Sequence, residues 1–263
     1  MKKLALTSLM AVFAVSGAHA ANVIDGNPLY MPGQNHFYSV STLGSHTEDT
    51  VYTAGEEFGY GILDNWAVNV ETAVSEDNAF DNMEWDGMKF GTTFRALDLG
   101  AWKLDLMGSY TVAPVWGDHR PFLDEDDTGY EWMAGVRGGF VASNWTVAGR
   151  ALFEYSNTES FNWGDEGMHA LVFGLTGQYV FDSNWSVLAD IAYRGITDDK
   201  IGGVKVENAG EWTGELAVNY NIDATKYVGL YINGAMDHWK DNGTKGWEVE
   251  DGFGFGARFG IDF

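Results

Sequence analysis

The chain has 263 residues, no cysteine and a formal charge of −23, from 38 acidic and 15 basic residues. No disulfide can stabilise the fold, and nucleic acid is excluded as a partner because phosphate binding needs an excess of Lys and Arg. The 34 glycines, 16 Phe, 12 Tyr and 11 Trp are typical of many-stranded β proteins.

The first twenty residues predict a secretory signal peptide. They begin Met-Lys-Lys, continue through an apolar stretch from Leu4 to Val15, and end in Ala18-His19-Ala20, a small-residue cleavage site. Cleavage of this peptide would remove Lys2 and Lys3 and change the net charge from −23 to −25. The apolar stretch is shorter than the roughly 20 residues of a membrane-spanning helix, and no later window is long and apolar enough.

A short polar turn followed by an aromatic residue recurs along the chain. The turns are Asp64-Asn65, Asp98-Leu99-Gly100, Ser143-Asn144, Asp182-Ser183-Asn184 and Asp223-Ala224-Thr225. The aromatic residues after them are Trp66, Trp102, Trp145, Trp185 and Tyr227. Longer acidic loops, at about residues 44–49, 75–86, 113–129, 156–167, 197–208 and 237–250, alternate with the turns.

This alternation predicts about twelve antiparallel strands with both chain ends on the short-turn side. A repeat of about 40 residues would also suit a propeller or a solenoid. Only the turn and its aromatic residue repeat, whereas the loop lengths and sequences do not, so an all-β, up-and-down barrel is favoured.

Side chains alternate along the predicted strands. Trp145, Val147 and Phe153 share one face, while Arg150 and Glu154 share the other. A soluble barrel or sandwich has the same period of two, with its apolar face turned inward. Aromatic residues at the strand ends, and polar faces rich in Gly, Ala, Thr and Ser, favour the inverted case of a transmembrane barrel with apolar side chains towards lipid.

The last residues, DGFGFGARFGIDF, place Phe259, Ile261 and Phe263 on one face. With this ending the sequence resembles Gram-negative outer-membrane β-barrel proteins, whose last strand ends in Phe as the signal read by the barrel-assembly machinery. The resemblance implies an outer-membrane location, short periplasmic turns, long extracellular loops, and contact with lipid and lipopolysaccharide.

We therefore divide the chain into a signal peptide (1–20), an N-terminal periplasmic segment (21–34) and a β-barrel domain (35–263). Asp25 to Gln34 could lie under the barrel or inside it. The aromatic residues after the short turns are expected to form a girdle at the membrane boundary.

Charged residues on the polar faces are expected to form a belt at similar depth in the lumen. This predicted charge belt comprises Glu57, Glu71, Arg95, Asp105, Arg137, Arg150, Asp190, Glu215 and Arg258. Charges inside a membrane protein indicate either a water-filled passage or a network of satisfied ion pairs. We favour a porin-like channel for passive diffusion of small hydrophilic solutes, with an Arg and carboxylate constriction and acidic outer loops. Twelve-stranded channels include the oligogalacturonate-specific porins, but no motif matches them and their basic lumen differs from this acidic chain.

Two other classes stay open. A non-conducting structural or adhesive barrel is the main alternative, with Asp124 to Asp127 offering oxygen ligands to calcium but lacking a dedicated calcium loop. A barrel hydrolase is the lesser one. Its candidate residues are His169 with Ser156 or Ser160, and Asp118-His119 near Asp124 and Asp126. We expect no enzyme activity, because none of these residues forms a family motif, and we expect no cofactor.

Overall fold

The computed structural model describes residues 28–46, 52–76, 83–114, 128–157, 168–182, 184–198, 200–201, 204–223, 225–241, 244–246 and 253–263. The predicted signal peptide and residues 21–27 lie outside the described residues, as do Asp118, His119, Ser160 and the acidic run from Asp124 to Asp127. No helix among the described residues is long and apolar enough to cross a membrane.

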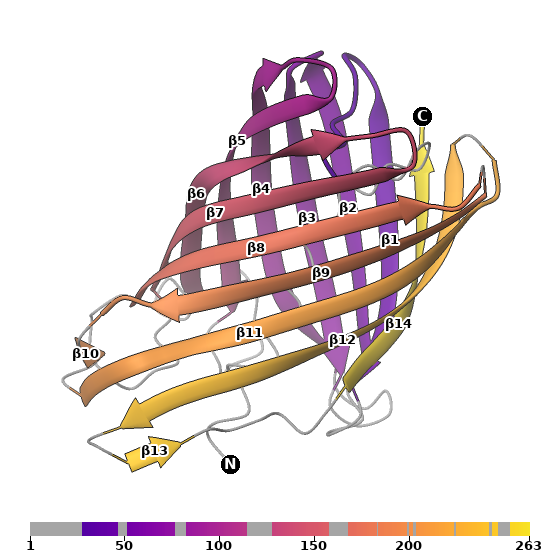
Figure 1. Ribbon diagram of the computed structural model, residues 1–263. Helices are drawn as coiled ribbons and strands as arrows, with labels where there is room; N and C mark the ends of the chain where they lie inside the picture. Colours follow the sequence, from indigo (N-terminus) through magenta and orange to yellow (C-terminus); the bar gives the residue numbers. More distant parts are fainter. Residues whose placement is uncertain are drawn as a thin grey trace.

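Twelve antiparallel strands form a closed barrel (Figure 1). They are β1 (Phe37–His46), β2 (Tyr52–Leu63), β3 (Trp66–Glu76), β4 (Met83–Asp98), β5 (Trp102–Pro114), β6 (Thr128–Val141), β7 (Trp145–Asn157), β8 (Met168–Val180), β9 (Trp185–Ile196), β11 (Val204–Asn221), β12 (Lys226–Asp241) and β14 (Phe253–Asp262). Two short strands, β10 (Lys200–Ile201) and β13 (Thr244–Gly246), extend the β11 and β12 hairpins and were not anticipated. The predicted fold class is confirmed.

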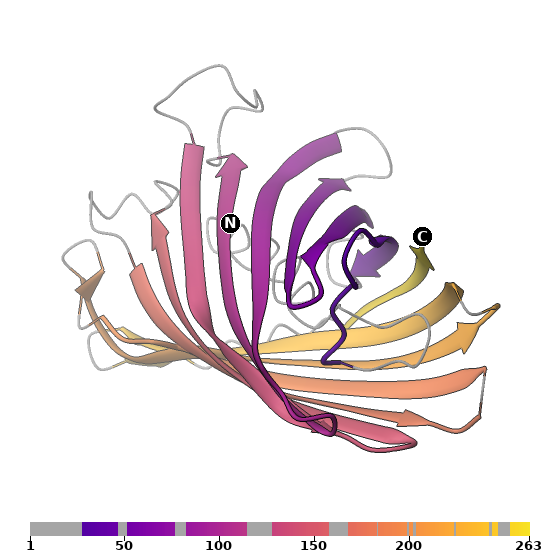
Figure 2. The same cartoon turned by 90° about the horizontal axis from the view of Figure 1, so that it is seen from above.

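The first and last strands close the cylinder. β1 pairs with β14 from Tyr38 opposite Asp262 to His46 opposite Gly254. Beyond this ladder, the amide of Phe263 donates to the carbonyl of Phe37 at 2.8 Å. Seen from above, the strands curve around a common interior (Figure 2). Because the described strands of the ring all have neighbours on both sides, their backbone groups are satisfied without water.

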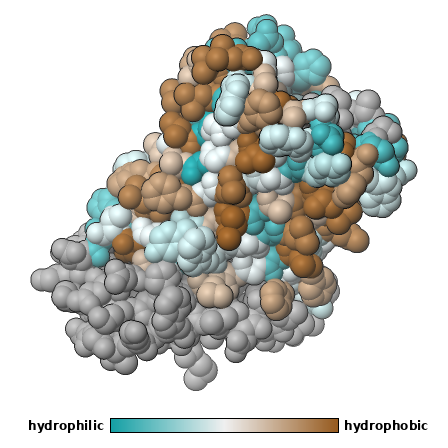
Figure 3. Space-filling view, in the orientation of Figure 1, coloured by the Kyte–Doolittle hydropathy of each residue, from teal (hydrophilic) through white to brown (hydrophobic). Residues whose placement is uncertain are grey.

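The barrel is inverted relative to a soluble protein. Phe253 is 68% exposed and Leu216 is 47% exposed on the outer surface, whereas Arg150 and Glu215 are each only 9% exposed inside. Brown hydrophobic side chains are prominent on the outside in Figure 3. The period-two pattern of the sequence therefore has its apolar face outward, as expected for strands that cross lipid.

The tight turns gather at one end of the barrel, which we call the short-turn end; the opposite end is the long-loop end. Asp182 and Asp223 stabilise two of these turns with their carboxylates. Asp182 Oδ1 accepts from the amides of Asn184 at 2.8 Å and Trp185 at 2.9 Å, and Asp223 Oδ1 accepts from the amide of Thr225 at 2.8 Å. The hydrogen bond from the amide of Asn184 is the main cause that lowers the pKa of Asp182. The hydrogen bond from the amide of Thr225 lowers the pKa of Asp223 in the same way. The recurring Asp in the sequence is thus a turn residue.

Candidate functional site in the barrel lumen

The nine residues of the predicted charge belt all project into the barrel. Asp105 is fully buried, and the other eight side chains are almost fully shielded from bulk solvent. Their inward direction follows from strand alternation, since each lies next to outward residues such as Leu104 and Leu106 beside Asp105. The belt consists mainly of direct ion pairs between neighbouring or next-neighbouring strands.

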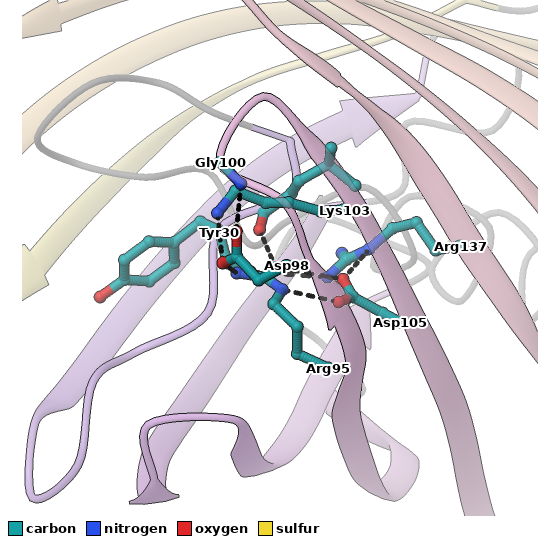
Figure 4. Close-up of polar contacts among 8 residues, drawn as sticks. Tyr30, Arg95, Asp98, Gly100, Lys103, Asp105 and Arg137 are labelled. Atoms are coloured by element: carbon teal, nitrogen blue, oxygen red, sulfur yellow. Dashed lines mark hydrogen bonds and ion pairs between the residues drawn. The ribbon is translucent and has the colours of Figure 1, made fainter.

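Three adjacent strands share one carboxylate. Asp105 on β5 accepts from Arg95 Nε on β4 at 2.9 Å and from Arg137 Nη2 on β6 at 2.8 Å (Figure 4). A second contact, from Arg137 Nε, is 3.2 Å long. The two guanidinium groups therefore hold Asp105 from both sides, and this cluster is rigid because each partner is fixed by charged hydrogen bonds.

Two further arginines each reach over an intervening strand. Arg150 on β7 crosses β8 to form a bidentate pair with Asp190 on β9, with distances of 2.6 and 2.9 Å. Its guanidinium lies over Gly174 of β8, where a Cβ atom would be 2.4 Å from Arg150 Cζ. Glycine is required beneath this arginine because any side chain would displace it.

The second pair of this kind joins β14 to β11 across β12. Arg258 donates to Glu215 through Nη1 at 3.0 Å and through Nη2 at 2.8 Å. The same guanidinium lies 4.5 Å from the ring centre of Tyr231, a cation–π contact. Both pairs link strands that are not hydrogen-bonded neighbours.

The two remaining belt residues, Glu57 and Glu71, belong to a polar cluster with three residues that the sequence analysis missed. Tyr38 donates to Glu57 Oε1 at 2.5 Å, and Asn69 donates to Glu57 at 3.1 Å and to Glu71 at 2.8 Å. Lys89 Nζ lies 3.3 Å from Glu71. The alternation of β4 could have revealed Lys89, because it shares the inward face with Arg95.

A second missed pair lies closer to the long-loop end. Arg194 on β9 donates through Nε to Glu154 on β7 at 2.8 Å, again crossing β8. Glu154 lies on the same face of β7 as Arg150, and Arg194 lies on the same face of β9 as Asp190, so strand alternation could have predicted that both face the lumen. The charged lining therefore has more than one layer along the barrel axis.

The described part of the N-terminal segment, residues 28–34, enters the lumen, and we call it the plug. Leu29 is completely buried, and its carbonyl accepts from Arg95, while the carbonyl of Tyr30 accepts from Arg137 Nη2 at 3.5 Å. The Tyr30 hydroxyl donates to Asp262 Oδ2 at 2.9 Å. Of the two positions that the sequence left open, the described residues adopt the one inside the barrel.

A cavity of about 90 Å³ separates the plug from the wall. Tyr30, Met31 and Pro32 line it on the plug side, and the polar cluster of Tyr38, Glu57, Asn69, Glu71 and Lys89 lines it on the wall side. This volume is large enough for a few water molecules, and the polar groups of the wall could serve as their hydrogen-bond partners. Apolar side chains, among them Met107, Met133 and Leu152, also line the cavity, so its wall is mixed in polarity.

Of the five residues of the predicted aromatic girdle, four lie on the outer surface of the barrel, whereas the fifth, Tyr227, faces the lumen, which corrects that part of the prediction. Trp66, Trp102, Trp145 and Trp185 are on the outer surface at the short-turn end, whereas Tyr227 is only 1% exposed. Each tryptophan is the first residue of its strand, but β12 begins with Lys226, and a shift of one residue reverses the face. Tyr227 instead covers Gly260 inside the barrel, and Tyr220 packs on Trp185 outside at 4.8 Å between ring centres.

The candidate pair of His169 and Ser156 does not form. Ser156 is opposite Met168 and faces inward, whereas His169 is opposite Tyr155 on the outer face. His169 Nδ1 lies 3.0 Å from Asp198 Oδ1. Within the described residues, no group of three or more His, Cys, Asp or Glu side chains is placed to hold a metal ion.

The C-terminal residues Phe259, Ile261 and Phe263 alternate on the outer face of β14 and just beyond its end. Their position suits contact with lipid. Their role as the signal for barrel assembly stays a prediction.

No family model matches the sequence, and no curated protein matches it. Solved structures do share the fold. The NanC porin aligns with a TM-score of 0.59 at 8% identity, over 86% of this chain and 98% of that one. The KdgM porin, solved in complex with disordered oligogalacturonate, aligns at 0.54 and 9% identity, over 86% and 99%. An outer membrane channel from Pseudomonas putida F1 aligns at 0.54 and 10% identity, over 89% and 97%. The fold of this chain is therefore that of outer-membrane porin and channel barrels.

Proposed function

We propose that this protein is an outer-membrane channel for the passive diffusion of small hydrophilic solutes. The observation that carries the proposal is a closed cylinder with an apolar outside and charged side chains on the inner wall. Such a wall attracts water, and a water-filled barrel gives polar solutes a route that lipid denies them. The likeness of fold to porins supports the same conclusion.

Selectivity in this proposal depends on size first and on charge second. The plug and the cluster of Arg95, Asp105 and Arg137 narrow the lumen at the short-turn end, so only small solutes pass. The chain carries a net charge of −23, with acidic residues concentrated in the long connections between strands. This charge favours cations over anions near the long-loop end through its electrostatic field.

The alternative is a non-conducting structural barrel, and the plug is the observation that favours it. Backbone carbonyls of the plug are held by Arg95 and Arg137, and its Tyr30 hydroxyl is held by Asp262. With the plug fixed at three points, the cavity between it and the polar cluster has a volume of about 90 Å³. A permanently closed barrel would need such an arrangement.

Planar-bilayer recordings with two proteins separate these functions. One is the mature chain, and the other is the same chain without residues 21–34. We expect discrete conductance steps from the mature chain and larger steps from the shortened one, with a preference for K⁺ over Cl⁻ in a salt gradient. Conductance from the shortened chain alone would identify a closed barrel, and its absence from both would refute the channel.

A further inference from the structure

The outer surface of β1, β2 and β3 is chemically unlike the rest of the barrel wall. Glu56 on β2 projects outward, on the same side as its strand neighbour Phe58, which is 57% exposed. Ser39 and Ser41 of β1 lie beside it, and Thr72 of β3 lies opposite. We call these four residues the outer polar patch. Elsewhere on the described strands, the outward positions between the aromatic bands hold no charged side chain.

The patch lies at a depth where a barrel normally contacts lipid tails. Glu56 is seven positions before Leu63, the last residue of β2 at the short-turn end. At about 3.3 Å per residue and a tilt of about 40°, Glu56 is about 18 Å into an apolar band about 25 Å tall. A carboxylate there is unfavourable against hydrocarbon.

Hydrogen bonds within the patch prepare Glu56 to act as an acceptor. Ser39 Oγ donates to Oε1 at 2.5 Å and Ser41 Oγ donates to Oε2 at 2.6 Å. Thr72 Oγ1 donates to the carbonyl of Gly87 at 3.0 Å and accepts from Trp85 Nε1 at 2.9 Å. Both carboxylate oxygens are thus oriented, and each retains a further lone pair for an external donor.

A second copy of this chain is a poor occupant for the same surface. In a two-fold contact each Glu56 would face its counterpart, and like charges repel. The hydrogens of Ser39, Ser41 and Thr72 are already donated within each copy. A cationic side chain supplies both the opposite charge and the missing donors, and the fork of an arginine matches the two free lone pairs.

We propose that the outer polar patch binds another membrane-embedded protein through a Lys or Arg side chain at the depth of Glu56. The small side chains of Ser39 and Ser41 allow the partner backbone to approach closely, as small residues do at interfaces within membranes. This surface is outside the lumen and does not depend on whether the barrel conducts.

The test uses the folded mature chain in phosphatidylcholine vesicles, with a synthetic transmembrane helix as the probe. The helix consists of about 20 leucines with one central lysine, and it is compared with the same helix without lysine. Energy transfer from a donor dye on an Asn65→Cys variant to an acceptor dye on the helix reports association. We expect the lysine helix to bind about tenfold more tightly than the all-leucine helix.

The Glu56→Gln variant should remove this difference, whereas Glu57→Gln, its neighbour facing the lumen, should retain it. Because Glu56 lies outside the barrel, Glu56→Gln folds, and the heat-dependent gel mobility of intact barrels verifies this. Equal binding of the lysine helix to the parent chain and to Glu56→Gln would overturn the proposal. Energy transfer between barrels that is lost in Glu56→Gln would also overturn it, because the occupant would then be a second copy.

Discussion

Replacing Asp105 by Asn should destabilise the barrel strongly, because this one carboxylate neutralises two arginines. Asp105 has no exposure, and Arg95 and Arg137 contact it at 2.9 and 2.8 Å. Removing one partner of a buried ion pair costs about 3–5 kcal/mol of unfolding free energy. Asparagine keeps one acceptor oxygen, and the cavity beside Arg137 has room for water that would hydrate part of the freed charge. We therefore expect a loss of about 3 kcal/mol, towards the lower end of that range.

Urea unfolding of the barrel in lipid vesicles, followed by tryptophan fluorescence, measures this loss. The matched control is Asp98→Asn, which removes the same charge at the short-turn end, where the side chain of Asp98 is 45% exposed and pairs with Lys103 at 2.7 Å and, at the longer distance of 4.0 Å, with Arg95. An exposed pair contributes less than about 1 kcal/mol, and asparagine can still accept from the amide of Gly100. Equal losses for the two variants, or a loss below about 1 kcal/mol for Asp105→Asn, would refute the reasoning that the lumen cluster is a buried network.

Three other outcomes are expected. Gly174→Val should displace Arg150 and lower the unfolding free energy by about 3 kcal/mol. Gly177→Val, at a position with open space, should be nearly neutral. Similar losses for the two variants would contradict a steric clash between a side chain at position 174 and Arg150. Tyr30→Phe removes the hydroxyl that donates to Asp262 and should increase the frequency of channel openings in bilayer recordings. An unchanged frequency would show that this hydrogen bond does not hold the plug in a closed position. The pKa of Asp182 is lowered in the folded state, so its contribution is complete above the unfolded pKa of about 3.9 and is lost as pH falls through the folded value. The stability difference between the parent chain and Asp182→Ala should therefore be larger at pH 7 than at pH 3 in urea unfolding, and an unchanged difference would contradict the turn hydrogen bonds.

The strand number and the direction of most side chains were predictable because both depend on local rules. A strand has a period of two, so one outward residue such as Trp145 assigns Arg150 and Glu154 to the lumen. Alternating short and long connections gave the strand count. The same rule failed at Tyr227, since the length of the preceding turn decides which residue of β12 comes first.

The partners of the charged residues were not predictable from one-dimensional spacing. Arg150 passes over β8 to reach Asp190, which depends on the inclination of the strands and on the bare backbone of Gly174. The location of the plug was also not predictable, because Leu29 and Tyr30 interact through their backbone carbonyls, and these are the same in every residue.

The link between Arg258 and Glu215 has a consequence for how the cylinder is completed. Strand β14 pairs with β1, the strand that is furthest from it along the chain, and the two strands align nine residue pairs. If β14 were shifted by one residue along its neighbours, Arg258 would face the hydrocarbon and its ion pair with Glu215 on β11 would be lost. The ion pair with Glu215, two strands away, therefore helps to align the last strand, because a shift by any odd number of positions removes Arg258 from the lumen.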